Sequence, residues 1–179
     1  MTLKLKRTPG IYLVGFMGAG KSTIGRRLAQ DLGWTFADLD EDIEAAENRQ
    51  ISAIFEQDGE AVFRRLETEA LARRVRRIQA GTPTVLALGG GAFVTEANRD
   101  LVKDNGLTIW LDGPFETLWD RVSRASHRPL ARERARFEEL HLARRSSYAL
   151  AEYRIDVCDD NPAVAVEAIL ELPPFSRQP

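Results

Sequence analysis

Gly15-Phe16-Met17-Gly18-Ala19-Gly20-Lys21-Ser22 is the stretch of this sequence that decides the fold. It matches the pattern G-x-x-x-x-G-K-[ST], in which glycines let backbone N–H groups curl around phosphate oxygens. A helix that begins at such a loop adds a favourable dipole for an anion. Lys21 can reach the β- and γ-phosphates, and the Ser22 hydroxyl can ligate Mg²⁺. The stretch therefore predicts a nucleoside-triphosphate-binding loop.

The residues on either side of this loop alternate between buried strands and helices. The run 11–14 is short, apolar and rich in strand formers, and 22–32 carries apolar residues at helical spacing. Such strands, apolar throughout and separated by helices, indicate an α/β fold with a parallel sheet covered on both faces. Further strands are expected at 34–37, 84–88, 108–111 and 153–157. Further helices are expected at 41–48, 51–57, 60–80, 96–103, 114–124 and 162–170, and a long helix after residue 132 is expected to end near residue 151.

Length and composition favour one compact domain. The 179 residues are 44% hydrophobic and 29% charged, as in an ordinary globular protein. We expect a single domain over 1–179, with a core at about 10–172 and loose tails at 1–9 and 173–179. A monomer is expected because the sequence shows no obvious apolar patch.

Charge and cysteine content exclude several classes of protein. The net charge of −2 argues against electrostatic binding of nucleic acid. No apolar run approaches the roughly 20 residues of a membrane span, so no membrane partner is expected. The lone Cys158 excludes a cysteine-based zinc site. It also fits a reducing cytoplasm, which we expect because the N-terminus shows no signal peptide.

Two aspartates follow the second expected strand. If the chain is still extended there, Asp38 and Asp40 point to the same side, and carboxylates so close usually hold a cation or a donor. Either one could instead cap the helix expected to start near Glu41.

An arginine–glutamate pair and a run of glycines are further candidates. Arg64 and Glu67 share one face of a helix, which fits either a functional pair or a surface ion pair. Three glycines, Gly89 to Gly91, follow a buried strand and let a ligand or another backbone come close. Other arginines of the same helix are expected to form a solvated face: Arg65, Arg73, Arg74, Arg76 and Arg77.

A polar loop at about 124–132 carries Arg128-Pro129-Leu130. A mobile loop with an arginine can act as a lid that closes over ATP and supplies charge to the transition state, although an ordinary exposed loop has the same composition. The two histidines, His127 and His141, are expected to be solvated.

In this order the motifs resemble those of the shikimate kinase family, in the nucleoside-monophosphate-kinase-like branch of P-loop proteins. The resemblance runs from about Ile11 to Leu170. It implies a three-layer α/β/α P-loop kinase fold with a central five-stranded parallel sheet and a mobile lid. Besides the phosphate loop and the two aspartates, its markers are Ile54-Phe55, Gly59-Glu60, Phe63-Arg64, Glu67, Gly89-Gly90-Gly91, Arg128-Pro129-Leu130, and Arg144 with Tyr148.

The resemblance implies Mg²⁺-dependent transfer of the γ-phosphoryl group of ATP to the 3-hydroxyl of shikimate, a step of aromatic amino acid (chorismate) biosynthesis. Arg64, oriented by Glu67, and Arg144 would hold the carboxylate of shikimate. Asp40 would orient or deprotonate the attacking hydroxyl. The glycines Gly89, Gly90 and Gly91 would give the acceptor its backbone contacts.

On the ATP side, the resemblance implies that Lys21 and Arg128 act in catalysis together with Asp40. Ser22 would hold Mg²⁺, and Asp38 would hold it through water. Either Arg121 or Arg124 would face the adenine. The full set of expected ATP contacts is Gly18, Ala19, Gly20, Lys21, Ser22, Thr23, Arg121, Arg124 and Arg128.

The chain departs from the family pattern in three places. One is the short lid between Arg124 and Arg128, which leaves both Arg121 and Arg124 as candidates for the adenine side. Asn48 stands where glycine is common, and asparagine tolerates the left-handed conformation. The loop Asp159-Asp160-Asn161-Pro162 carries acids where some relatives carry arginine, which bears on the adenine contacts.

Two other functions fit part of the pattern. Another small-molecule kinase of this fold is one, such as a gluconate kinase or a nucleotide kinase, although an acceptor without a carboxylate leaves Arg64 and Arg144 without a role. A non-catalytic ligand sensor is the other. It would normally need an output module, and the presence of Lys21, Asp40 and Arg128 together favours chemistry.

Overall fold

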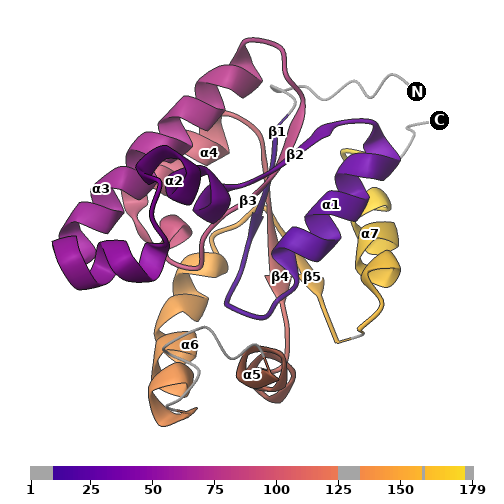
Figure 1. Cartoon of the computed structure of the whole chain (residues 1–179). Helices are drawn as coiled ribbons and strands as arrows, with labels where there is room; N and C mark the ends of the chain where they lie inside the picture. Colours follow the sequence, from indigo (N-terminus) through magenta and orange to yellow (C-terminus); the bar gives the residue numbers. More distant parts are fainter. Residues whose placement is uncertain (1–9, 125–133, 159, 176–179) are drawn as a thin grey trace.

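The computed structural model describes residues 10–124, 134–158 and 160–175 of the chain (Figure 1). Strands and helices alternate along it, as the apolar pattern predicts. The elements are β1 (Gly10–Val14), α1 (Lys21–Leu32), β2 (Thr35–Asp38), α2 (Leu39–Glu47), α3 (Ile51–Gln79), β3 (Thr84–Ala87), the 3-10 helix η1 (Ala92–Val94), α4 (Glu96–Asp104), β4 (Leu107–Asp112), α5 (Phe115–Arg124), α6 (Arg134–Tyr148), β5 (Tyr153–Asp156) and α7 (Pro162–Leu170).

The five strands form one parallel sheet in the order β2-β3-β1-β4-β5. From β1 the chain continues to β2 at one edge of the sheet, whereas from β3 it crosses over β1 to β4, toward the opposite edge. The carboxyl end of β1 therefore lies at the point where the strand order reverses, which is where open α/β sheets bind ligands. The phosphate loop occupies this position.

Helices cover both faces of the sheet, giving three layers (Figure 1). Helices α1 and α7 pack together on one face, and α3 and α4 lie on the other. Helices α5 and α6 lie beyond the carboxyl ends of the strands. The strands β1, β3 and β4 are buried along their whole length, so the core lies between the sheet and these two helical layers. The predicted α/β fold with a five-stranded parallel sheet is confirmed.

The second strand ends at the two aspartates, for which the sequence left an extended chain and a helix cap open. The chain is not extended as far as Asp40, so the two side chains do not share a strand face. The strand stops at Asp38, whose carboxylate caps α2 by accepting a hydrogen bond from the Asp40 N–H at 3.0 Å. Asp40 therefore lies in the first turn of a helix.

Two of the positions with left-handed backbone bear on the helix boundaries expected from the sequence. Gly59, with φ of 83°, interrupts α3 where the pattern predicts a break. Asn48 ends α2 at φ 50°, which confirms that asparagine can replace the glycine common at this position.

The segment after α7 is packed against the core as far as residue 175. Phe175 is buried, and its N–H donates to the Leu172 carbonyl at 2.9 Å. This part of the expected tail is therefore not loose. None of the helices within the described ranges has both the length and the apolar character needed to cross a bilayer.

Candidate active site

The phosphate loop is held open by close packing against β4. Gly15 has φ of 145°, and a Cβ there would lie 2.5 Å from the Leu111 carbonyl oxygen. Gly20 adopts the left-handed conformation at φ 84° and is the N-cap of α1. These glycines let the loop wrap toward the helix N-terminus, where the unpaired N–H groups and the dipole favour an anion.

Lys21 is folded over this loop. Its Nζ donates to the carbonyl oxygens of Gly15 at 2.8 Å and Phe16 at 3.0 Å. The ammonium group is thereby held against the loop.

Ser22 and Asp38 lie together beside the loop. The Ser22 hydroxyl donates to Asp38 Oδ2 at 2.5 Å, while Asp38 Oδ1 caps α2. Asp38 thus serves both of the roles that the sequence left open. A hydroxyl beside a carboxylate suits Mg²⁺, which prefers oxygen ligands and usually binds one or two protein groups together with phosphates and water. Among the described residues, no group of three or more His, Cys, Asp or Glu could hold a metal by itself.

Three successive glycines each face a different one of the predicted acceptor-binding side chains. A Cβ on Gly89 would lie 2.6 Å from Asp40 Oδ1, and a Cβ on Gly90 would lie 3.3 Å from Arg144 Nη1. A Cβ on Gly91 would lie 2.6 Å from Arg64 Cζ. Residues from α2, α3 and α6 therefore meet over one glycine run at the end of β3.

Arg64 is oriented by two glutamates. Its Nη1 donates to Glu67 Oε2 at 2.9 Å, and its Nη2 donates to the exposed Glu60 at 3.2 Å. Glu67 is only 1% exposed, and burial raises the pKa of its carboxyl group although the Arg64 charge opposes this shift. The second oxygen, Oε1, has no hydrogen-bond partner among the described residues and lies on the Gly89 side, near Asp40.

Arg144 projects from α6 toward Phe16 of the phosphate loop. Its guanidinium lies over the Phe16 ring at 5.9 Å from the ring centroid. One turn on, the Tyr148 hydroxyl donates to the Gly90 carbonyl at 2.5 Å, which ties α6 to the glycine run. Burial raises the pKa of Tyr148 to about 12, so this hydroxyl stays protonated as a donor.

A hollow of about 250 Å³ opens beside the phosphate loop between α1, α5 and α7. Arg121 lines it, donating to the Gly18 carbonyl at 3.1 Å and pairing with Asp160 at 2.8 Å. Arg124 is exposed at the end of α5 and is not part of the lining. Of the two candidates for the adenine side, the structure brings Arg121 to the loop.

Most of the residues that line this hollow were not predicted from the sequence. Its apolar side is formed by Val157, Val164 and Ala165, and Cys158 also lines it. The one indication in the sequence was that residues 159–162 depart from the family pattern, and Asp160 of that loop forms the ion pair with Arg121. Thr23, another expected ATP contact, also lines this hollow.

Two expectations about charged residues are wrong. His141 is not solvated: it is 6% exposed, its ring lies 5.2 Å from Phe16, and burial lowers its pKa. Arg74 is not part of a solvated face, because its half-buried guanidinium pairs with Asp42. Arg128, His127 and the lid segment from residue 125 onward lie outside the described residues.

The fold and these groups define a class of protein. A parallel sheet with this loop at its switch point, Lys21 at the loop mouth and a carboxylate–hydroxyl pair beside it are the features of a P-loop phosphotransferase. A family model described as "Shikimate kinase" matches residues 17–172. The chain belongs to the shikimate kinase family.

Known relatives agree with this assignment. The chain is 45% identical over 145 residues to the shikimate kinase of Ruegeria pomeroyi, covering 79% of this chain and 72% of the relative. It is 41% identical to the shikimate kinase of Persephonella marina, covering 89% and 96%. The structure of the Acinetobacter baumannii shikimate kinase in complex with shikimate superposes with a TM-score of 0.84 at 37% identity, covering 92% of each chain. The resemblance read from the motifs is confirmed.

A gluconokinase from Sinorhizobium meliloti shares the fold, with a TM-score of 0.58 at 21% identity, covering 90% of this chain and 89% of the other. At that identity the likeness extends to the architecture alone. The family match therefore favours shikimate kinase over the gluconate kinase alternative.

Proposed function

We propose that this chain transfers the γ-phosphoryl group of Mg²⁺-ATP to the 3-hydroxyl of shikimate, giving shikimate 3-phosphate and ADP. The observation that carries the proposal is the glycine run 89–91, which faces one carboxylate and two guanidinium groups. A cyclic polyol with a carboxylate needs such a set, because guanidinium forks bind carboxylates and a carboxylate accepts from hydroxyls.

On the acceptor side, Arg64 and Arg144 hold the shikimate carboxylate, and Glu67 keeps Arg64 in place. Asp40 orients the attacking hydroxyl and accepts its proton as the O–P bond forms. The small size of Gly89 to Gly91 lets the ring lie against the backbone. These roles are supported by the closeness of the three side chains to the same short run.

On the donor side, the phosphate loop and Lys21 bind the β- and γ-phosphates, with Ser22 and Asp38 placed to hold Mg²⁺ directly and through water. When bound, Mg²⁺ neutralises charge on the phosphates. Because phosphoryl transfer needs mainly alignment and charge neutralisation, no covalent enzyme intermediate is required. The hollow beside Arg121 receives the adenine, and Arg128 adds charge when its loop closes as a lid.

Three further features stay predictions: a single domain over the whole chain, a monomer, and a cytoplasmic enzyme. The lone, exposed Cys158 is compatible with a reducing compartment.

The carboxylate assignment can be tested with shikimate and its methyl ester as acceptors. The ester keeps the ring hydroxyls but cannot form the charge-assisted bonds to Arg64 and Arg144. We expect its kcat/KM to be at least about 100-fold lower, because the free energy of two charge-assisted hydrogen bonds corresponds to at least that factor. Equal use of both acceptors would contradict the proposal that these arginines bind the carboxylate.

A further inference from the structure

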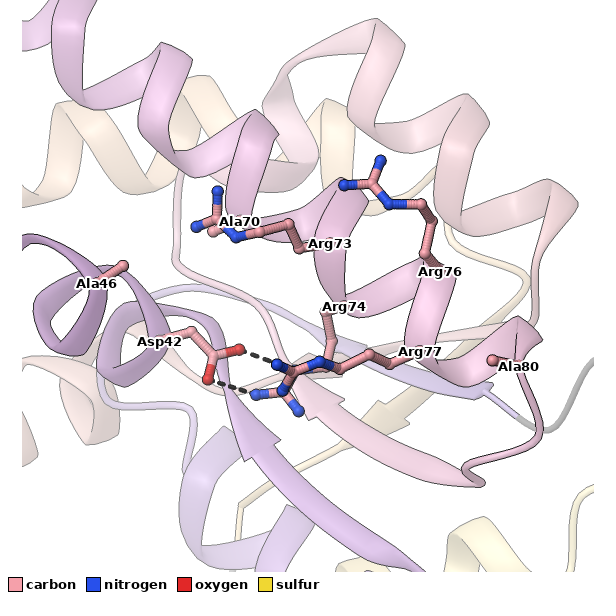
Figure 2. A pocket seen from close by; sticks show the side chains of 8 residues that line it. All are labelled: Asp42, Ala46, Ala70, Arg73, Arg74, Arg76, Arg77 and Ala80. Carbon is pink, nitrogen blue, oxygen red and sulfur yellow. Dashed lines mark hydrogen bonds and ion pairs between the residues drawn. The ribbon is translucent and has the colours of Figure 1, made fainter.

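A groove lies between α2 and α3, lined by none of the residues discussed for phosphoryl transfer (Figure 2). Its volume is about 460 Å³, which is within the range of small-ligand sites. Figure 2 shows arginines of α3 along one side, facing Asp42 and Ala46 of α2. The lining residues are Asp42, Ala46, Ala70, Arg73, Arg74, Arg76, Arg77 and Ala80.

The charges in this groove are not balanced. Asp42 is its one acid, and Arg74 engages both carboxylate oxygens of Asp42. Within the described residues, no hydrogen bond or ion pair engages the side chains of Arg73, Arg76 or Arg77. Besides the paired Arg74, these three guanidinium groups thus line one hollow in a protein whose net charge is −2. The last turn of α3 tolerates two of them because its free carbonyls favour cations.

The chemistry of these groups selects the ligand. Guanidinium forks bind phosphate oxygens with two hydrogen bonds, and several around one hollow suit an anion with more than one negative charge. The alanines at positions 46, 70 and 80 leave the space open and offer a small apolar surface. The lining is too poor in aromatic and large apolar side chains to suit a hydrophobic ligand.

We propose that the α2–α3 groove is a second anion site, which binds a small multivalent phosphate: inorganic pyrophosphate or a phosphate ester. An anion held there contacts both α2, which carries Asp40, and α3, which carries Arg64. Binding in the groove is therefore linked to the spacing of the two helices that form the acceptor side of the active site.

The test measures pyrophosphate binding by calorimetry to a Lys21→Ala chain, in which the phosphate loop has lost its cation. We expect one saturable site per chain, weakened about tenfold by adding Arg73→Gln or Arg77→Gln, since each removes one charge-assisted hydrogen-bond donor. Arg73 and Arg77 are exposed, so neither change disturbs the fold. Ribose 5-phosphate is titrated in parallel, and the tighter ligand tells whether the site prefers inorganic phosphate or an ester.

Arg65→Gln is the matched control, because Arg65 is an exposed arginine on the same helix outside the groove. It should leave the affinity unchanged. In chains that retain Lys21, Arg73→Gln and Arg77→Gln should leave kcat and the KM for ATP unchanged, whatever the acceptor proves to be. An equal loss with Arg65→Gln, or the absence of saturable binding, would overturn the proposal. So would binding of acidic peptides or nucleic acid in place of both phosphates.

Discussion

Asp40 and Glu67 approach the same point at the end of β3. A Cβ on Gly89 would lie 2.6 Å from an oxygen of Asp40 and 3.2 Å from Glu67 Oε1. Burial raises the pKa of Glu67, and the nearby Asp40 charge adds to this effect. Arg64 offsets this on the Glu67 side, through its bond to the other oxygen. Glu67 therefore holds the Arg64 guanidinium beside the glycine run, where we propose that it binds the acceptor carboxylate.

Replacing Asp40 tests its role as the base. Asp40→Asn keeps the size of the side chain but removes its ability to accept a proton. We expect kcat to fall by about 10²–10⁴-fold with little change in ATP affinity, the usual cost of losing a general base. Steady-state kinetics with Asp42→Asn as the control checks this, since Asp42 is paired with Arg74. An unchanged kcat would remove Asp40 from the chemistry.

Arg64→Lys tests the carboxylate fork while leaving a cation beside the buried Glu67. Lysine cannot make two parallel hydrogen bonds to a carboxylate, so we expect the KM for shikimate to rise by about 10- to 100-fold. The KM for ATP should stay within about twofold. Arg65→Lys, on the exposed side of the same helix, should change neither. A defect confined to ATP would contradict the assignment.

The buried Glu67 makes stability depend on pH. Because its pKa is raised in the folded state, folding favours the protonated form, and this contribution is lost as pH rises from about 4.5 through the folded pKa. Glu67→Gln cannot ionise, so its free energy of unfolding relative to the unaltered chain should increase over that range. Urea unfolding from pH 4.5 to 8 measures the difference. A difference that is constant with pH would show that burial does not raise the pKa of Glu67.

At the scale of elements, the junction between β2 and α2 decides where the Asp40 carboxylate lies. Apolar periodicity predicted both elements, but Asp38 could have extended the strand or capped the helix. Its side chain does the latter and also accepts a hydrogen bond from Ser22, 16 positions earlier, so one local and one long-range hydrogen bond fix the junction. Periodicity cannot show such bonds, because it reports which face is buried and not how side chains compete for backbone groups.

The glycine run is the other element that positions the site. Gly91 has ordinary backbone angles, so Gly91→Ala causes no backbone strain, but its methyl group would displace the Arg64 guanidinium. We expect a KM for shikimate raised by about tenfold or more, with unchanged ATP binding. Gly33→Ala, in open space with φ of 68°, is the control: it should lower stability by about 1 kcal/mol and leave both KM values unchanged. Equal effects of the two changes would contradict this.

Across the whole molecule, short local patterns predicted the architecture and long-range contacts decided the rest. Phosphate loop, strands and α7 follow from local sequence, since glycine spacing and apolar runs are local signals. The burial of His141 among the rings of Phe16 and Phe115 is not local, because these residues come from three separate segments. The pairing of Arg121 with Asp160 joins residues 39 positions apart, so the sequence left the choice between two arginines open.

The most direct test of the central claim is ADP release from Mg²⁺-ATP in parallel reactions with shikimate, gluconate, a nucleoside monophosphate or no acceptor. The arrangement of Asp40, Arg64 and Arg144 over one glycine run predicts strong stimulation by shikimate alone. Equal stimulation by gluconate would contradict the substrate assignment. Silence with every acceptor, while ATP and shikimate still bind, would contradict catalysis and indicate a ligand sensor.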